Sequence, residues 1–291
     1  MTNEKPLFPP VYIHEPTPEH THTAIMLHGR ASSGIEFSDD LFSSKLSGAN
    51  ENLPSRFPGW RWVFPSSRIL WSSTFQEEMP AWFDAYSLTD ITAEQDLQLD
   101  GIRESVEHLI GILDEEIGLL GGVGENLVLA GISQGAAVGL WTLLCRSRST
   151  SKIGGFVGAS CWLPLAEDVE IFLGEKPRAA EKTSDATVET SEALKFVEST
   201  MATTKTSFID YHSVNSLQST PVLLGHGVDD AYVDVELGKQ ARDILTKIGL
   251  VVQWREYTGA EEEGHWFKEP EQLNDIAEFL DAVGEPEKVS L

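Results

Sequence analysis

Short apolar runs of strand length recur along the chain and alternate with longer segments of helical periodicity. Strands are predicted at Val11–His14, Thr23–His28, Arg61–Pro65, Leu127–Ala130, Ile153–Ser160, Pro221–Gly225 and Val251–Tyr257. Apolar spacing of three to four residues predicts helices at Ala93–Gly118, directly after Ser133, at Val235–Ile248 and at Glu271–Val283. This alternation predicts an α/β fold with a mainly parallel central sheet and helices on both faces.

Two segments depart from the alternation. Ser66–Tyr86 is predicted to be irregular and is rich in aromatic residues, so it forms either the wall of an apolar substrate groove or packing over the sheet edge. Glu167–Thr220 is polar apart from a weakly helical piece at Glu192–Met201. We expect this insertion to act as a lid or to be partly disordered, above all at about 175–190. We expect it to belong to a single domain that covers residues 1–291.

A serine lies between two glycines where a predicted strand meets a predicted helix, in Gly131-Ile132-Ser133-Gln134-Gly135. This is the arrangement of a nucleophile elbow. The turn is so tight that larger side chains at the two glycine positions would collide with the backbone, and the serine takes a strained conformation. The helix N-terminus supplies N–H donors and a positive field beside the hydroxyl group. The alternative is an ordinary serine at a glycine-rich turn.

A second glycine-bearing corner, His28-Gly29-Arg30, follows the strand predicted at Thr23–His28. Acyl transfer needs two backbone donors for the oxyanion. One comes from the residue after the nucleophile, here Gln134, and the other usually comes from a loop after an earlier strand. The Arg30 N–H suits the second role, although the corner would also read as an ordinary strand-to-helix loop.

A serine nucleophile needs a base, and the base needs an acid that orients it. In α/β-hydrolases the chain order is serine, acid, histidine, and His265 is the histidine that fits this order. His28 and His226 each precede a glycine at a strand end, where a structural hydrogen bond is expected.

Position along the chain does not identify the acid of the triad. Asp229 and Asp230 are adjacent, and neighbouring side chains point in different directions. Asp234 is a third candidate, but its place before a predicted helix is typical of an N-cap. The residues alone leave Asp229 and Asp230 as alternatives.

Several motifs in a fixed order resemble those of one known family. They are L-H-G-R-A-S-S-G, M-P-A-W-F-D, G-I-S-Q-G-A, C-W-L-P-L, H-G-x-x-D-x-x-V and a late G-H. Together they resemble the acyl-protein thioesterase/carboxylesterase (phospholipase–carboxylesterase) family of α/β-hydrolases, from about residue 20 to residue 283 and excluding the insertion. The resemblance implies an α/β-hydrolase fold and a serine esterase or thioesterase that needs no metal and no cofactor.

The resemblance also implies roles for particular residues. By position, the site residues are the nucleophile Ser133, the acid Asp230, the base His265, the oxyanion donors Arg30 and Gln134, and the groove residues Trp82 and Trp162. Met79, within the aromatic segment, is added as a third groove residue. The sequence departs from the family at Arg30, whose guanidinium either favours an anionic acyl group or points outward, and at the long insertion, so that protein depalmitoylation is not assumed.

Composition narrows the functional classes. The formal net charge of −25 argues against binding to nucleic acid and against docking on anionic lipid through a basic patch. Two cysteines, Cys145 and Cys161, support neither a disulfide framework nor a zinc site. The N-terminal residues lack the apolar core of a signal peptide, and no apolar run is long enough to span a membrane. We therefore expect a cytoplasmic protein.

The function predicted from the sequence is a serine hydrolase of carboxylic esters or thioesters that acts through an acyl-enzyme. Its expected partners are a small-molecule ester or thioester, or an acylated protein. Two alternatives remain: a peptidase or lactone hydrolase on the same fold, and a non-catalytic binding protein. The sequence predicts neither the acyl-chain length nor the oligomeric state.

Overall fold

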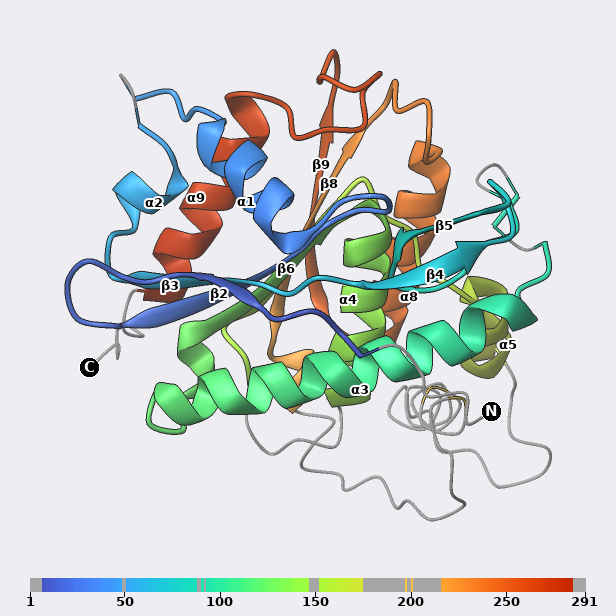
Figure 1. The fold of residues 1–291 in the computed structure, drawn as a ribbon, viewed down its shortest axis with the longest axis horizontal. Helices are drawn as coiled ribbons and strands as arrows, with labels where there is room; N and C mark the ends of the chain where they lie inside the picture. Colours follow the sequence, from blue (N-terminus) through green and yellow to red (C-terminus); the bar gives the residue numbers. More distant parts are fainter. Residues whose placement is uncertain are drawn as a thin grey trace.

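The protein is seen in a computed structural model that describes residues 7–48, 51–87, 90–91, 93–146, 152–174, 197, 200 and 216–284. A seven-stranded sheet forms its centre (Figure 1). The strands of this sheet are β1 (Tyr12–His14), β2 (His22–Leu27), β3 (Trp60–Phe64), β6 (Leu127–Ile132), β7 (Gly155–Ala159), β8 (Pro221–Gly227) and β9 (Val251–Tyr257). Their spatial order is β1-β3-β2-β6-β7-β8-β9.

The sheet is parallel except at one edge. Strand β1 pairs with β3 in the antiparallel direction, and all the other neighbouring strands run parallel. The carboxyl ends of β2, β6, β8 and β9 therefore meet at the same edge of the sheet, which is where ligands bind in open α/β sheets. This confirms the mainly parallel sheet predicted from the alternating pattern.

Helices cover both faces of the sheet, because successive strand side chains point to opposite sides (Figure 1). The helices are α1 (Gly34–Ser43), α2 (Leu53–Arg56), α3 (Asp96–Leu119), α4 (Ser133–Cys145), α5 (Ala166–Gly174), α8 (Val235–Ile248) and α9 (Glu271–Gly284). In strand β2, Ala24 and Met26 pack on the face covered by α1 and α9, while Ile25 and Leu27 pack on the face covered by α3, α4 and α8. None of the described helices is long and apolar enough to cross a membrane.

The segment Ser66–Tyr86 corrects one prediction. We expected it to be irregular, but most of it forms an antiparallel hairpin of β4 (Arg68–Ser72) and β5 (Glu77–Ala81). A polar, charged turn separates the two strands, and Pro80 lies in the second one, which weakens the strand pattern in the sequence. The hairpin is a separate two-stranded sheet, so its residues do not follow the hydrophobic alternation of the central sheet.

The insertion predicted at Glu167–Thr220 begins in helix α5, which packs on α8. The part expected to be disordered, about 175–190, and almost all of the weak helix expected at Glu192–Met201 lie outside the described residues. Before the insertion, α4 is buried along nearly all of its length between the sheet and α3. The helix that carries Ser133 is thus fixed on several sides.

Candidate active site

The elbow between β6 and α4 has the strained geometry that its sequence predicts. Ser133 has a φ of +54°, in the left-handed region that residues with a side chain rarely adopt. A Cβ atom on Gly135 would overlap the carbonyl oxygens of Leu27 and His28. A Cβ on Gly131 would lie 2.8 Å from the Ala136 nitrogen. The two glycines are therefore what allows the chain to turn this tightly under the serine.

The His28-Gly29-Arg30 corner lies directly beside the elbow. A Cβ placed on Gly29 would stand 3.5 Å from the Ser133 Cβ and 4.0 Å from its Oγ. Within the described part of the chain, the Arg30 N–H has no hydrogen-bond acceptor. Ala31 takes a positive φ of 62° and donates its N–H to Pro80 O at 2.9 Å, which turns the chain away from the corner. The Arg30 N–H thus follows directly after a residue that lies beside Ser133, and Arg30 and Ser133 line the same pocket.

Side chains join these two corners through the end of the hairpin. The Gln134 carbonyl oxygen accepts a hydrogen bond from Trp82 N at 2.9 Å, and its amide nitrogen donates to Phe83 O at 2.8 Å. The Trp82 indole N–H donates to His28 O at 2.8 Å. Because the side chain of Gln134 is fully used in this way, any catalytic contribution of Gln134 must come from its backbone N–H.

His28 is a structural histidine, as its place before Gly29 predicts. Its Nε2 accepts from Ser67 N at 3.0 Å, so its Nδ1 carries the proton and donates to Gly29 O at 2.5 Å. Burial lowers the pKa of His28 to about 4, against smaller opposing effects of the Gly29 hydrogen bond and the Glu36 charge. The ring is therefore neutral at physiological pH and holds the corner in place.

His265 meets Asp230 and not Asp229. His265 Nδ1 lies 2.8 Å from Asp230 Oδ2 and 3.0 Å from Oδ1, whereas Asp229 Oδ2 accepts from Gly259 N at 2.8 Å. The structure thus separates the two adjacent aspartates that the sequence left as alternatives.

The Asp230 side chain is fully buried but well provided with donors. Its Oδ1 accepts from the backbone nitrogens of Tyr232 and Val233, each at 2.9 Å. Burial acts to raise the pKa of Asp230, but the hydrogen bond and charge of His265 and these two N–H donors outweigh it and lower that pKa. Asp230 is thus held as a carboxylate, which fixes the His265 proton on Nδ1 and leaves Nε2 as the proton acceptor.

A pocket of about 390 Å³ gathers these groups at the carboxyl edge of the sheet. Ser133, His265, Arg30 and Trp162 all line it. Ser133 Oγ and His265 make no direct hydrogen bond to each other among the described residues, which is common for catalytic pairs without a bound substrate. The pocket is large enough for a small acyl group, and its nucleophile and base candidates face the same space.

Two of the predicted groove residues do not line this pocket. Trp82 is fully buried and holds the two corners together, and Met79 lies in β5 of the hairpin. From the aromatic segment, Phe75 lines the pocket, so part of that segment forms a wall and part is core packing.

Tyr232 is a pocket residue that the sequence reasoning missed. Its ring packs edge-on against His265 with the centroids 5.3 Å apart, and it remains 48% exposed. Its position two residues after Asp230 was the one signal in the sequence that could have found it.

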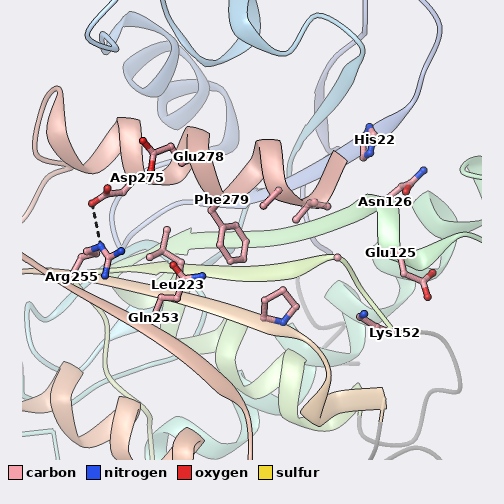
Figure 2. Close-up of a pocket in the computed structure, with 14 residues that line it drawn as sticks. His22, Glu125, Asn126, Lys152, Leu223, Gln253, Arg255, Asp275, Glu278 and Phe279 are labelled. Carbon is pink, nitrogen blue, oxygen red and sulfur yellow. Dashed lines mark ion pairs between the residues drawn. The ribbon is translucent and has the colours of Figure 1, made fainter. Parts of the chain in front are cut away.

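A second and larger cavity, of about 830 Å³, lies under α9 at the opposite edge of the sheet (Figure 2). It is lined at the amino ends of β2 and β8 by His22 and Pro221, and it contains an ion pair between Arg255 and Asp275. Among its described lining residues there is no serine, threonine or cysteine. Nor do the described residues contain a group of three or more His, Cys, Asp or Glu side chains that could hold a metal ion. The candidate nucleophile Ser133 lies in the smaller pocket.

The chain is similar to acyl-protein thioesterases in both sequence and structure. Acyl-protein thioesterase 1 of Gibberella zeae is 27% identical over 267 residues, which cover 90% of this chain and 90% of that protein. Acyl-protein thioesterase 1 of Yarrowia lipolytica is 27% identical over 266 residues, covering 90% of this chain and 92% of that protein.

Among solved structures, Zea mays acyl-protein thioesterase 2 superimposes with a TM-score of 0.66 at 21% identity, over 95% of this chain and 99% of that one. Arabidopsis thaliana SOBER1 gives a TM-score of 0.62 at 21% identity, over 91% of this chain and all of that one (100%). At these identities the likeness shows the fold. The sequence model of the Phospholipase/Carboxylesterase family matches residues 10–180, more than half of the chain, including both glycine corners. The chain therefore belongs to the phospholipase/carboxylesterase family of α/β-hydrolases.

Proposed function

We propose that this protein hydrolyses carboxylic esters or thioesters through a Ser133–His265–Asp230 triad and an acyl-enzyme. The observation that carries the proposal is that Ser133 and His265 line the same pocket. Ser133 has a left-handed backbone conformation, and His265 is hydrogen-bonded to Asp230. The family to which the chain belongs, and relatives called acyl-protein thioesterase, support an ester or thioester as the substrate class.

In the first half-reaction, His265 Nε2 takes the proton of Ser133 Oγ as that oxygen attacks the acyl carbon. The carbonyl oxygen becomes an oxyanion, and the backbone N–H groups of Gln134 and Arg30 donate to it. The buried carboxylate of Asp230 stabilises the imidazolium ring. When the tetrahedral intermediate collapses, the C–O or C–S bond breaks and His265 gives its proton to the departing alcohol or thiol.

In the second half-reaction, His265 takes a proton from water, and the resulting hydroxide attacks the acyl carbon. The bond between Ser133 Oγ and the acyl group breaks, the proton returns to Ser133, and a carboxylic acid leaves. No redox change occurs in either half-reaction. Every proton that is transferred moves through His265.

The fixed separation of the two oxyanion donors supports this mechanism. Gln134, Trp82 and His28 tie the elbow and the Gly29 corner together through hydrogen bonds of 2.8–2.9 Å. Donors held rigidly in a partly desolvated site need little reorganisation when negative charge develops, and this is the main source of such stabilisation.

Small esters, thioesters and acylated proteins are the partners we infer, in a cytoplasmic setting. A peptidase or lactone hydrolase would use the same triad, so a panel of acyl esters, acyl thioesters, lactones and aminoacyl amides separates these substrate classes. Fractionation of cells that produce a tagged full-length chain tests the location.

The direct test of the triad is intact-mass analysis after treatment with a fluorophosphonate, on the wild type and on Ser133→Ala. A single adduct is expected on the wild type and none on the variant, because only an activated serine reacts. Turnover of an ester that the wild type hydrolyses should fall about a millionfold in Ser133→Ala, as in other triads that lose their serine.

Two outcomes would refute the proposal. One is wild-type hydrolysis rates in Ser133→Ala, which would move the nucleophile elsewhere. The other is the absence of both an adduct and ester hydrolysis in the wild type, which would favour a binding protein on this fold. Circular dichroism of the variant checks that it is folded.

A further inference from the structure

The side chain of Arg30 has no role in the mechanism above, which uses only its backbone N–H. Yet the residue lines the pocket together with Ser133 and His265. Among the described residues around that pocket, Arg30 is the only lysine or arginine. The residue is only partly exposed, and its guanidinium lies over the ring of Phe75, which lines the same pocket as Ser133.

No carboxylate of the described residues forms an ion pair with the Arg30 guanidinium. Within the described structure it makes no hydrogen bond and no ion pair. The carboxylate whose charge acts on it, Asp84, accepts hydrogen bonds from the nitrogen and hydroxyl of Ser73. Burial lowers the pKa of Arg30, and the charge of Asp84 acts in the opposite direction. A partly desolvated cation without a partner is costly, and a bound anion would remove this cost.

The guanidinium is also held in position by the hairpin. Its Cζ lies 5.6 Å from the centre of the Phe75 ring, in the turn between β4 and β5. A cation over the face of an aromatic ring is attracted to it, and the N–H donors of the guanidinium remain able to bind a carboxylate. Phe75 lines the pocket as well.

Two carboxylates, Asp40 and Glu262, also line the pocket, but both residues are exposed and neither forms an ion pair with Arg30. Their charges are screened by solvent, whereas Arg30 is half-buried. The remaining walls include the apolar residues Phe37, Ile132 and Trp162. The pocket therefore combines one fixed, poorly solvated cation with apolar surface.

We propose that Arg30 selects esters or thioesters that carry a carboxylate a short chain away from the scissile carbonyl group. The inference rests on the proposed hydrolase function and names the substrate class of the same site. The backbone and side chain of one residue would then bind both ends of the substrate. The Arg30 N–H donates to the oxyanion, and its guanidinium donates two parallel hydrogen bonds to the distal carboxylate.

The test compares two matched esters. One is the mono-para-nitrophenyl ester of adipic acid, whose acyl chain ends in a carboxylate, and the other is para-nitrophenyl heptanoate, which has a neutral chain of similar length. The ratio of their kcat/KM values is measured for the wild type, Arg30→Gln and Arg30→Lys, after subtraction of spontaneous hydrolysis. Using the ratio removes any effect of the substitution that is common to both esters.

In a second arm, para-carboxyphenyl butyrate is compared with phenyl butyrate, so that the carboxylate lies on the leaving group. We expect Arg30→Gln to lower the anionic-to-neutral ratio by about 10- to 100-fold in one arm, the effect of losing hydrogen bonds to a charged group. Arg30→Lys should retain part of the ratio, because it keeps the charge but not the planar fork. The arm that responds identifies which part of the substrate carries the carboxylate.

Lys152→Gln is the matched control, because it removes one positive charge from the cavity at the opposite edge of the sheet (Figure 2). Its ratio should stay at the wild-type value. The inference is overturned if Arg30→Gln leaves the ratio unchanged in both arms, or if Lys152→Gln lowers it equally. A wild-type protein that hydrolyses none of the four esters overturns this inference, and the proposed hydrolase function falls with it only if the wild type also forms no fluorophosphonate adduct.

Discussion

Replacing Gln134 by methionine tests whether its hydrogen bonds to Trp82 and Phe83, the two residues that follow the β4–β5 hairpin, stabilise the fold. Methionine has nearly the same length and volume as glutamine, so the substitution opens no large cavity. It removes the acceptor of Trp82 N, now at 2.9 Å, and the donor to Phe83 O, now at 2.8 Å. Gln134 is only 1% exposed, so water has little access to the two backbone groups left behind.

The cost follows from these two orphaned groups. Each buried backbone group without a partner destabilises a protein by about 1–3 kcal/mol. The apolar methionine side chain gains about 1–2 kcal/mol from burial, which offsets part of that loss. The midpoints of these ranges are about 4 kcal/mol for the two groups and about 1.5 kcal/mol for the methionine, so the expected net decrease in the free energy of unfolding is about 2.5 kcal/mol.

Urea denaturation followed by tryptophan fluorescence measures this difference for the wild type and Gln134→Met. The matched control is Gln253→Met, at an exposed position of β9 where the described structure shows no hydrogen bond of the side chain. That variant should change the stability by less than about 0.5 kcal/mol. If Gln134→Met also changed the free energy of unfolding by less than about 0.5 kcal/mol, the hydrogen bonds to Trp82 and Phe83 would not be stabilising. The argument for a rigid pair of oxyanion donors would then fail.

Two further predictions concern the titration of His28 and the role of Asp230. Because the pKa of His28 is about 4 in the fold and about 6.5 in the unfolded chain, the unfolded state binds the extra proton, and the stability that His28 contributes above pH 6.5 is lost as the pH falls towards 4. Urea denaturation from pH 7 to pH 4 should show a loss of about 3 kcal/mol that is missing in His28→Gln, and an unchanged slope in that variant would contradict the pKa assignment. Asp230→Asn should lower kcat about 10,000-fold, whereas Asp229→Asn should lower it by less than about tenfold, and equal losses in steady-state assays would contradict the pairing of Asp230 with His265.

The sequence alone predicted the central sheet, the elbow and the relative order of the serine and histidine. Buried parallel strands appear as apolar runs, and the tight turn at Ser133 needs glycines at positions 131 and 135, so both leave a local signal. The parallel direction of the strands followed from general rules for alternating strands and helices, and it places the carboxyl ends of β6, β8 and β9 at one edge, whereas the strand order came from the structure. Local pattern was sufficient for the individual strands and for the elbow, because each depends on neighbouring residues.

The tertiary structure decided which side chains face the pocket. Asp229 and Asp230 have the same chemistry, and the contact with Gly259 or His265, about thirty residues away, separates them. The family resemblance assigns Trp82 to the substrate groove. Its indole N–H instead donates a hydrogen bond to His28 O, 54 positions earlier in the chain. Likewise, the Arg30 guanidinium lies over the ring of Phe75, a pocket residue of the hairpin. Such orientations depend on contacts between segments that are distant in sequence, and hydrophobic periodicity contains no information about those contacts.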